Sequence, residues 1–306
     1  MTSRSTGRIR LIVHAGTSKT GTSTLQFYLN RNRAALLQAG ILYPLEGTQE
    51  LRAPKHQWMV SPLMSARLPE LRQRIARVVA EITPDTHTII LSTEGLFNHW
   101  WDFPDTSKDF LREVSQDFDT SVWIWFREPV AFWASYYMQA MRNPRIAAIP
   151  AYGHDHSAGG LLDIPWAARH LEYPSYLSEF ERVFGEGSVY AFAHARDIVD
   201  EVCNLLGIAR QDADAPRENA TALTAAGLDM LRIVNRYRLN VREKEQAYDL
   251  VGQINGLIGK RDFPFAIPDD VVARIRQISG FTQDMLDALH RDSHERWVAR
   301  YHPPVA

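Results

Sequence analysis

Cysteine is almost absent from this chain, which has a single one, Cys203, in 306 residues. One cysteine excludes a disulfide framework within the chain and any metal site built mainly from thiolates. The apolar and charged fractions, 45% and 23%, are ordinary for a globular protein. At this length we expect one large domain, or one domain with a helical extension.

Long apolar runs are missing as well. No stretch approaches the roughly 18 apolar residues that a membrane-spanning helix needs. The basic residues near the N-terminus are followed by only three apolar residues, Leu11–Val13, which does not fit a signal peptide. The sequence therefore predicts a cytoplasmic protein without a membrane span.

The chain also lacks an excess of charge of one sign. Its formal net charge is −2, and lysine and arginine form no long block. Proteins that bind nucleic acids depend on clustered basic residues that neutralise phosphates. Nucleic acid is therefore not expected as the main partner.

What the chain does have is a glycine-rich segment, Gly16–Thr24, between two apolar patterns. The run from Ile9 to Val13 before it predicts a strand, and the amphipathic run led by Leu25 predicts a helix. A turn between strand and helix points backbone N–H groups and a helix N-terminus at one spot, which suits a phosphate. Lys19 supplies the cation that tight binding of a polyanion needs.

The spacing within this segment is close to a Walker A loop, but the lysine is displaced. Gly16 and Gly21 have the G-x-x-x-x-G spacing, and Ser23 stands where the Mg²⁺-binding hydroxyl would be. Thr22 occupies the lysine position, and Lys19 comes three residues earlier. A nucleoside triphosphatase would lose its contact with the β and γ phosphates, so we expect a phosphate ester other than ATP or GTP.

Strand and helix patterns alternate along most of the chain. This alternation predicts an α/β fold with three layers and a central, mainly parallel sheet. We expect a single domain over residues 1–306, with a core at about 8–208 and a C-terminal helical extension at about 220–306. Strands are expected at 9–13, 88–91, 121–126 and 188–193, with a short extended segment at 41–44 after the first helix. Helices are expected at about 22–39, 68–82, 106–118, 129–141, 173–184, 196–206, 221–239, 242–258, 269–279 and 282–300.

Three polar residues follow predicted strands. Lys19, Glu94 and Arg127 each come shortly after a buried strand. Ligands of parallel sheets bind beyond the carboxyl ends of the strands. The sequence therefore predicts a binding site to which all three contribute.

Arg127 begins a second motif. Pro129 fits the first turn of a helix, and Ser135 would lie about 9 Å along that helix. An arginine fork and a helix hydroxyl together suit a second phosphate group. The structural alternative is that Arg127 pairs with Asp105 or Glu128 and that Ser135 is a small packing residue.

Together the two motifs resemble those of the sulfotransferases that use 3′-phosphoadenosine 5′-phosphosulfate (PAPS). The 5′-phosphosulfate loop of that family has a lysine, a Gly-Thr pair and further hydroxyls after a strand, as in Lys19–Thr24. Its 3′-phosphate motif is a strand-end arginine, a proline, and a serine eight residues after the arginine, and Arg127, Pro129 and Ser135 match it. The close resemblance covers roughly the first 140 residues, and Ser92–Glu94 also looks like the bacterial carbohydrate and small-molecule branch.

The resemblance implies a sheet topology like that of P-loop nucleoside triphosphatases. It also implies transfer of a sulfuryl group from PAPS to a hydroxyl, or less readily an amine, of a saccharide or small-molecule acceptor. The product would be 3′-phosphoadenosine 5′-phosphate (PAP), and no metal is expected. Lys19 would stabilise the leaving phosphate, and a donor without a γ-phosphate explains its displacement. The implied donor-binding residues are Ser18, Lys19, Thr20, Gly21, Thr22, Ser23, Thr24, Arg127 and Ser135.

A hydroxyl acceptor also needs a base, for which the family uses histidine or glutamate. His56, in the irregular segment after the first helix, and Glu94, at a strand end, are the candidates. His14 is expected to buttress the loop instead. The alternatives are that His56 is an ordinary surface histidine and that Glu94 positions the acceptor, the loop or Lys19.

Two rival functions remain open from the sequence. One is a P-loop kinase with an aberrant loop, and the other is a nucleotide-binding protein without turnover. A His154-Asp155-His156 segment suggests a metal, but it lies in a Gly/Ser-rich stretch without obvious further ligands. A solvated or acceptor-facing loop is the preferred interpretation of that segment.

Overall fold

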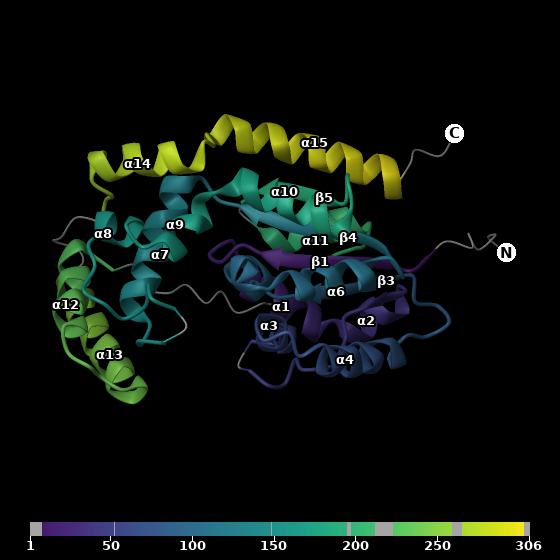
Figure 1. Ribbon diagram of the computed structural model, residues 1–306, viewed down its shortest axis with the longest axis horizontal. Coiled ribbons are helices and arrows are strands. Elements are labelled where there is room, and N and C mark those ends of the chain that lie inside the picture. Colours follow the sequence, from purple (N-terminus) through teal and green to yellow (C-terminus); the bar gives the residue numbers. More distant parts are fainter. Residues whose placement is uncertain are drawn as a thin grey trace. The chain divides into compact units, whose positions relative to one another are not determined.

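The structure is a computed structural model in which the chain forms two compact units (Figure 1). The first unit contains Met1–Phe126, Ser175–Glu218 and Asp284–Ala306, and the second contains Arg127–Pro174 and Asn219–Gln283. The residues described are 8–51, 53–147, 149–194, 197–211, 223–258 and 265–302.

A five-stranded, all-parallel sheet forms the centre of the first unit, and helices flank it. The prediction of a three-layer α/β fold is thereby confirmed. The strand order is β2-β3-β1-β4-β5, so the strand that precedes the glycine-rich loop lies in the middle. The strands are β1 (Arg10–Gly16), β2 (Ile41–Leu42), β3 (Thr88–Ser92), β4 (Asp119–Phe126) and β5 (Val189–Ala193).

Burial on both faces explains why the strands are continuous apolar runs. In β4 every residue after Asp119 is buried, and a strand covered on both faces is apolar at successive positions. Trp123 and Trp125 of β4 belong to the core of the first unit, together with Leu25 and Trp297 from distant parts of the chain. This core fixes the strand on which the glycine-rich loop is supported.

The first predicted helix is interrupted at Asn32. It forms as α1 (Thr22–Arg31) and α2 (Arg33–Gln38) rather than as one helix over 22–39. The Asn32 backbone N–H and side-chain amide both donate to the carbonyl of Tyr28, at 3.1 and 2.9 Å. An asparagine side chain that competes for backbone groups favours such a break. The chain then leaves α2 at Gly40, whose φ is +76°.

The helices predicted at 68–82, 106–118, 173–184, 196–206 and 282–300 form within a few residues of those bounds. Four short helical elements at 57–59, 60–64, 95–98 and 100–102 were not predicted, and the first two lie in a segment that was expected to be irregular. In α11 (Ile198–Leu206), Asp197 accepts hydrogen bonds from the backbone of Val199 and Asp200, and Gly207 ends the helix in the left-handed region. These elements are η1 (Gln57–Met59), α3 (Val60–Met64), α4 (Leu68–Ala80), α5 (Gly95–Asn98), η2 (Trp100–Asp102), α6 (Asp105–Ser115), α10 (Tyr173–Phe184, which begins in the second unit), α11 (Ile198–Leu206) and α15 (Gln283–Tyr301).

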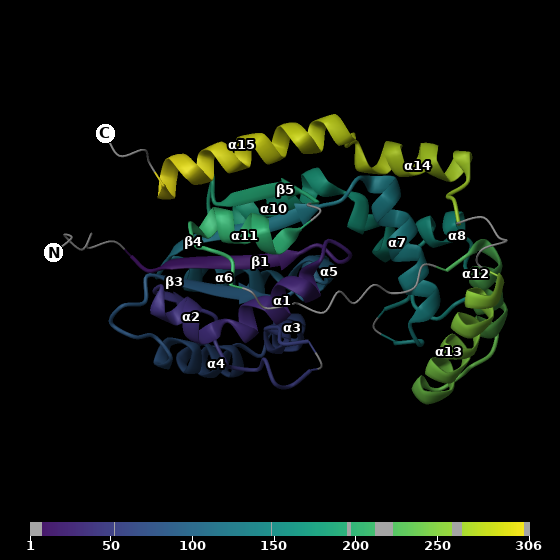
Figure 2. The same ribbon diagram turned by 180° about the vertical axis from the view of Figure 1, so that it is seen from behind.

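The second unit is helical (Figure 2). It has its own core, in which Phe132, Trp133 and Tyr136 pack with Leu228 and Ile275. The predicted C-terminal helices are divided between the units, because α15 carries Trp297 into the core of the first. The second unit contains α7 (Pro129–Arg142), α8 (Ala158–Leu162), α9 (Pro165–Ala168), η3 (Arg169–Leu171), α12 (Ala225–Asn235), α13 (Val241–Ile258) and α14 (Asp269–Ser279).

The helices are also too short or too polar for a lipid bilayer. Within the ranges that the structure describes, no helix has both the length and the apolar character needed to cross a membrane. The prediction of a chain without a membrane span agrees with this finding.

Candidate functional site

The glycine-rich loop joins the end of β1 to α1 through backbone conformations of the left-handed region. Lys19 has φ +70° and Gly21 has φ +89°. Among the described residues no side chain caps α1 at Gly21, and no acidic residue lies in its first turn. The first N–H groups of a helix have no partner within the helix and carry its positive end. The N-terminus of α1 therefore suits an anion.

The inner side of the loop is fixed by two threonines. The backbone N–H and hydroxyl of Thr17 both donate to the carbonyl of Trp125 on β4, at 3.2 and 2.9 Å. The hydroxyl of Thr20 donates to the carbonyl of Thr17 at 2.7 Å, and both threonine side chains are fully buried. The Thr20 hydroxyl therefore uses its proton inside the loop, which argues against its predicted contact with a ligand.

The outer side of the loop holds the more accessible residues. Lys19, Ser23 and Thr24 are half-buried, whereas Thr22 is buried. Ser18 is nearly buried, and its hydroxyl donates to Asn98 at 3.1 Å. Of the predicted donor-binding hydroxyls in the loop, those of Ser23 and Thr24 are the ones most accessible to a ligand.

Glu94 packs directly against the first residue of the loop. Gly16 has φ +107°, and a Cβ atom placed on it would lie 3.1 Å from both Cα and Cβ of Glu94. A glycine is needed here both for its backbone conformation and for this close approach. The sequence-based expectation that these two segments meet at one edge of the sheet is thus met in the first unit.

The carboxylate of Glu94 is bound on both oxygens. Lys55 Nζ lies 2.5 Å from Oε1, and Gln26 Nε2 donates to Oε2 at 3.2 Å. Burial by itself would raise the pKa of Glu94, but the charge and hydrogen bond of Lys55, together with the Gln26 amide, outweigh it and hold the pKa below its ordinary value. Glu94 is therefore an ionised, fixed carboxylate and a weak base.

Lys55 is a functional candidate that the sequence alone did not single out. It stands beside His56 in the irregular segment after β2, and its side chain is only 19% exposed. A buried lysine needs a carboxylate partner. The sequence could have indicated Lys55, because it is a lysine in a polar segment and a glutamate was expected at the end of a neighbouring strand.

His56 is enclosed by the protein and cannot reach an acceptor as a base, so its role is a different one. The ring is fully buried. Its Nδ1 accepts the backbone N–H of Ser92 at 3.0 Å, so Nε2 carries the proton and donates to the carbonyl of Pro44 at 3.1 Å. Burial lowers the pKa of His56 to about 4. With both nitrogens engaged and no access, His56 ties the chain after β2 to the end of β3, which corrects its interpretation as the base.

His14 packs beneath the glycine-rich loop, against Ser92 at the end of β3 and Trp125 of β4. Its Nδ1 lies 2.8 Å from the hydroxyl of Ser92, and its ring meets the edge of Trp125 at a centroid distance of 5.3 Å. The ring is fully buried, and burial lowers the pKa of His14 to about 4. A neutral, buried histidine under Trp125 fits the expected buttressing role.

Arg127 and Ser135 meet in the second unit. Arg127 follows β4 in the chain, and its Nη1 lies 3.4 Å from the hydroxyl of Ser135. The Glu128 carboxylate does not pair with Arg127; it accepts the backbone N–H of Ala131 at 2.8 Å as the N-cap of α7. The hydroxyl of Tyr173 donates to the backbone carbonyl of Arg127 at 2.9 Å. The arginine backbone is therefore anchored while its guanidinium points to the serine hydroxyl.

A cavity of about 490 Å³ lies elsewhere in the first unit. It is lined by Ala193, His194 and residues of α11 and α15, but not by the glycine-rich loop. One lining residue, Glu201, accepts the indole N–H of Trp125 at 2.8 Å, and burial raises its pKa to about 7. Nothing in the sequence pattern had singled out Glu201.

The described residues offer no gathered set of metal ligands. No three histidine, cysteine, aspartate or glutamate side chains in those ranges lie closely enough together to hold an ion. The residues assembled around the loop are instead Lys19, hydroxyls and backbone N–H groups, which suit an oxyanion, together with the ion pair of Lys55 and Glu94.

Comparison with known proteins gives no assignment. No protein-family model matches the chain, and no curated protein matches it either. The function is therefore inferred from the residues and their geometry.

Proposed function

We propose that this protein is a sulfotransferase that moves a sulfuryl group from PAPS to a hydroxyl of a saccharide or small-molecule acceptor. The observation that supports this most is the contact of Arg127 with Ser135, at 3.4 Å, in the spacing of a 3′-phosphate motif. A 3′-phosphate distinguishes PAPS and PAP from ATP. A kinase has no comparable use for this pair.

The glycine-rich loop is proposed to hold the phosphosulfate end of the donor. The uncapped N-terminus of α1 offers backbone N–H groups, and Lys19, Ser23 and Thr24 add a cation and two accessible hydroxyls. Thr17 and Thr20 keep the loop in shape through their bonds to Trp125 and to each other. Preorganised donors of this kind stabilise charge as it develops, without reorganisation during the reaction.

The transfer itself is an in-line displacement at sulfur. The acceptor oxygen forms a bond to sulfur while the bond from sulfur to the bridging oxygen of the 5′-phosphate breaks. The electron pair of the broken bond stays on the phosphate of PAP, and Lys19 stabilises that charge. Positioning and charge stabilisation carry most of the catalysis in group transfers of this type.

The proton of the acceptor hydroxyl is proposed to pass to Glu94. A carboxylate with a lowered pKa cannot deprotonate a free alcohol, but the hydroxyl becomes acidic as its oxygen bonds to sulfur. Lys55 and Gln26 hold the carboxylate in place for this late transfer. The carboxylate accepts these two bonds and one from the backbone N–H of Glu94 itself, so of its four lone-pair sites one is left to accept the proton.

The proposal is tested by following the conversion of PAPS to PAP with a panel of saccharides and phenols as acceptors. Lys19→Ala should abolish acceptor-dependent conversion and leave the thermal unfolding curve close to that of the wild type. Arg77→Ala, at an exposed position of α4 in the same unit, is the control and should retain activity. Undiminished conversion by Lys19→Ala would remove the assigned role of the loop.

A further inference from the structure

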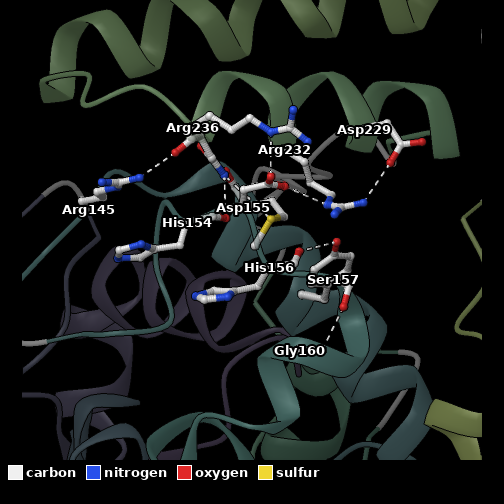
Figure 3. A network of polar contacts seen from close by, with 12 residues as sticks. Arg145, His154, Asp155, His156, Ser157, Gly160, Asp229, Arg232 and Arg236 are labelled. Atoms are coloured by element: carbon white, nitrogen blue, oxygen red, sulfur yellow. Dashed lines mark hydrogen bonds and ion pairs between the residues drawn. The ribbon is translucent and has the colours of Figure 1, made fainter.

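Residues Gly153–Ser157 of the second unit, here called the histidine loop, are held in one conformation by a set of side chains (Figure 3). Every residue of the loop takes part in at least one hydrogen bond or ion pair. The bonds to its backbone carbonyls come from Arg145 Nε to Gly153 at 3.0 Å, Asn235 Nδ2 to His154 at 3.2 Å and Tyr137 Oη to His156 at 2.9 Å, and Ser157 Oγ accepts the N–H of Gly160 at 2.9 Å.

Asp155, in the middle of the loop, is bound to helix α12. Its carboxylate oxygens lie 3.1 Å from Arg232 Nε and 2.8 Å from Arg236 Nε. Arg232 also pairs with Asp229, at 3.4 Å. These ion pairs hold the Asp155 carboxylate on the side of the loop that faces α12.

His154 and His156 consequently point the other way. Figure 3 shows the two imidazole rings side by side, on the opposite side of the loop from the arginines of α12. Their centroids are 5.4 Å apart, and the planes are inclined by 34°. In the part of the chain that the structure describes, no hydrogen bond is made by a ring nitrogen of either residue, although both rings are half-buried. The fold therefore places two imidazole rings side by side and leaves their nitrogens able to bind a ligand.

The surroundings of these rings carry an excess of positive charge. Arg145 donates to the neutral carbonyls of Gly153 and Asn235 and so keeps its full charge. Lys244 is buried on the Asn235 side chain, and burial together with Arg145 lowers its pKa to about 8. The cations of this group are Arg145, Arg232, Arg236 and Lys244, and the carboxylates are Asp155 and Asp229, which leaves two positive charges in excess.

This charge acts on the two histidines. Burial is the largest cause that holds the pKa values of both imidazoles below the ordinary value. At His154 the charges of Arg145 and His156 lower the pKa further. At His156 the nearby Asp155 opposes the lowering, and Arg145 adds to it to a smaller extent. The positive charge of Arg145, which disfavours protonation of the imidazoles, favours a bound anion at the same place. Binding an anion would also permit the imidazoles to become charged donors.

We propose that His154 and His156, beside Arg145, form a binding site for an oxyanion: a sulfate, phosphate or carboxylate group. Such a group accepts hydrogen bonds from both rings and offsets the excess charge of Arg145 and its neighbours. The site lies wholly within the second unit, and its ligand binding does not depend on the sulfuryl transfer proposed above. The ligand is either an acidic group on an acceptor or a free inorganic anion.

Anion binding at this site is coupled to protonation of the rings. Because the anion favours the imidazolium form, affinity should rise as the pH falls, by up to about tenfold per pH unit for each proton taken up. Asp155 works against this effect, since a carboxylate opposes a nearby anion, but its pairing with Arg232 and Arg236 limits that repulsion. The affinity should therefore increase between pH 8 and pH 5.5.

The test is a titration of the histidine ring signals by NMR, with inorganic sulfate as the probe and no nucleotide present. Sulfate should raise the pKa values of His154 and His156, and it should not move the ring signals of His294, an exposed histidine of the first unit. His154→Gln/His156→Gln should lose at least tenfold in sulfate affinity at pH 5.5. His294→Gln is the matched control and should bind like the wild type.

Three further probes identify the source of the anion. Glucose 6-sulfate or glucuronate binding more tightly than inorganic sulfate would support an acidic acceptor, and equal or tighter binding of the inorganic ion would support a free anion. The proposal would be overturned if neutral glucose bound as tightly as glucose 6-sulfate. The proposal is also overturned if sulfate leaves both pKa values unmoved, or if the double variant binds sulfate normally.

Discussion

Lys55 Nζ lies 2.5 Å from Glu94 Oε1, and both side chains are more than four-fifths buried. The pair joins the segment after β2 to the end of β3, next to the first residue of the glycine-rich loop. It brings a cation and a carboxylate to the edge of the sheet where Lys19 is also found. The proposed proton acceptor is thus part of an ion pair and not an isolated acid.

Removal of Lys55 should leave a charged carboxylate without its main partner. We expect Lys55→Met to reduce the free energy of unfolding by about 2 kcal/mol at pH 7, since an unpaired buried charge is costly. Adding Glu94→Gln should restore part of that loss. Urea unfolding of the two single variants and the double variant measures the coupling.

The exposed pair of Arg72 and Glu113 is the control for this cycle, because its side chains are 56% and 60% exposed. Its coupling should be no more than about 1 kcal/mol. Because the pKa of Glu94 is lowered in the folded state, the Lys55 coupling is full above the ordinary glutamate pKa and should fade as the pH drops through the lowered one. Equal coupling for the two pairs would contradict the assignment of a buried pair at the site.

Gly16 should be sensitive to substitution for two separate reasons. An alanine there would adopt a strained φ near +107° and would place Cβ 3.1 Å from the backbone of Glu94. Gly185 has φ +105° but no atom within 4 Å of the added Cβ, so Gly185→Ala introduces the strain alone. We expect Gly185→Ala to cost about 1–2 kcal/mol and Gly16→Ala to cost more.

Binding separates the two glycines further. Gly16→Ala should weaken PAP binding, because it displaces the loop from Glu94, whereas Gly185→Ala should bind PAP like the wild type. Urea unfolding and calorimetry measure the two effects. Identical stability losses and unchanged PAP affinity in both variants would show that the approach of Glu94 to Gly16 has no functional weight.

His56 should make stability depend on pH. Its pKa is about 4 in the folded state against an ordinary 6.5, so the unfolded chain binds the extra proton between these values. The contribution of His56 is therefore complete above pH 6.5 and is lost as the pH falls towards 4, at up to about 1.4 kcal/mol per pH unit. His14 acts in the same direction, and Glu201, with a raised pKa of about 7, acts in the opposite one.

A comparison of variants isolates the contribution of His56. The free energy of unfolding of His56→Gln should vary less steeply than that of the wild type between pH 6.5 and 4. It should also be lower at pH 7, because the bonds to Ser92 and Pro44 are disturbed. Parallel pH curves for the two proteins would mean that His56 titrates normally and is accessible, as a base would be.

Much of the fold could be predicted because its signals are local. The strands are apolar runs, and the helices have regular apolar spacing and recognisable ends, such as Gly207 after α11. The break at Asn32 was not predicted because it depends on one amide that binds the carbonyl of Tyr28, while the apolar spacing continues across it. The division of the C-terminal helices between two units depends on long-range packing of Trp297, which no local pattern reveals.

The site was predicted less evenly than the fold. The loop and the pair of Arg127 and Ser135 have fixed spacings in the sequence, so they could be named in advance. The roles of His56 and Lys55 could not, because adjacent residues in an irregular segment differ in burial only once the chain has folded. His56 is fully buried with both nitrogens bound, and Lys55 reaches Glu94.

The central claim, a site for PAPS, is tested most directly by calorimetry with PAP and with ATP–Mg²⁺ on the wild type and on Arg127→Ala. We expect PAP to bind the wild type without a metal and more tightly than ATP–Mg²⁺. In Arg127→Ala the affinity for PAP should fall about ten- to a hundred-fold, the equivalent of a charge-assisted hydrogen bond of roughly 1.5–3 kcal/mol. Tight binding of ATP–Mg²⁺ without binding of PAP, or an unchanged affinity for PAP in Arg127→Ala, would contradict the claim.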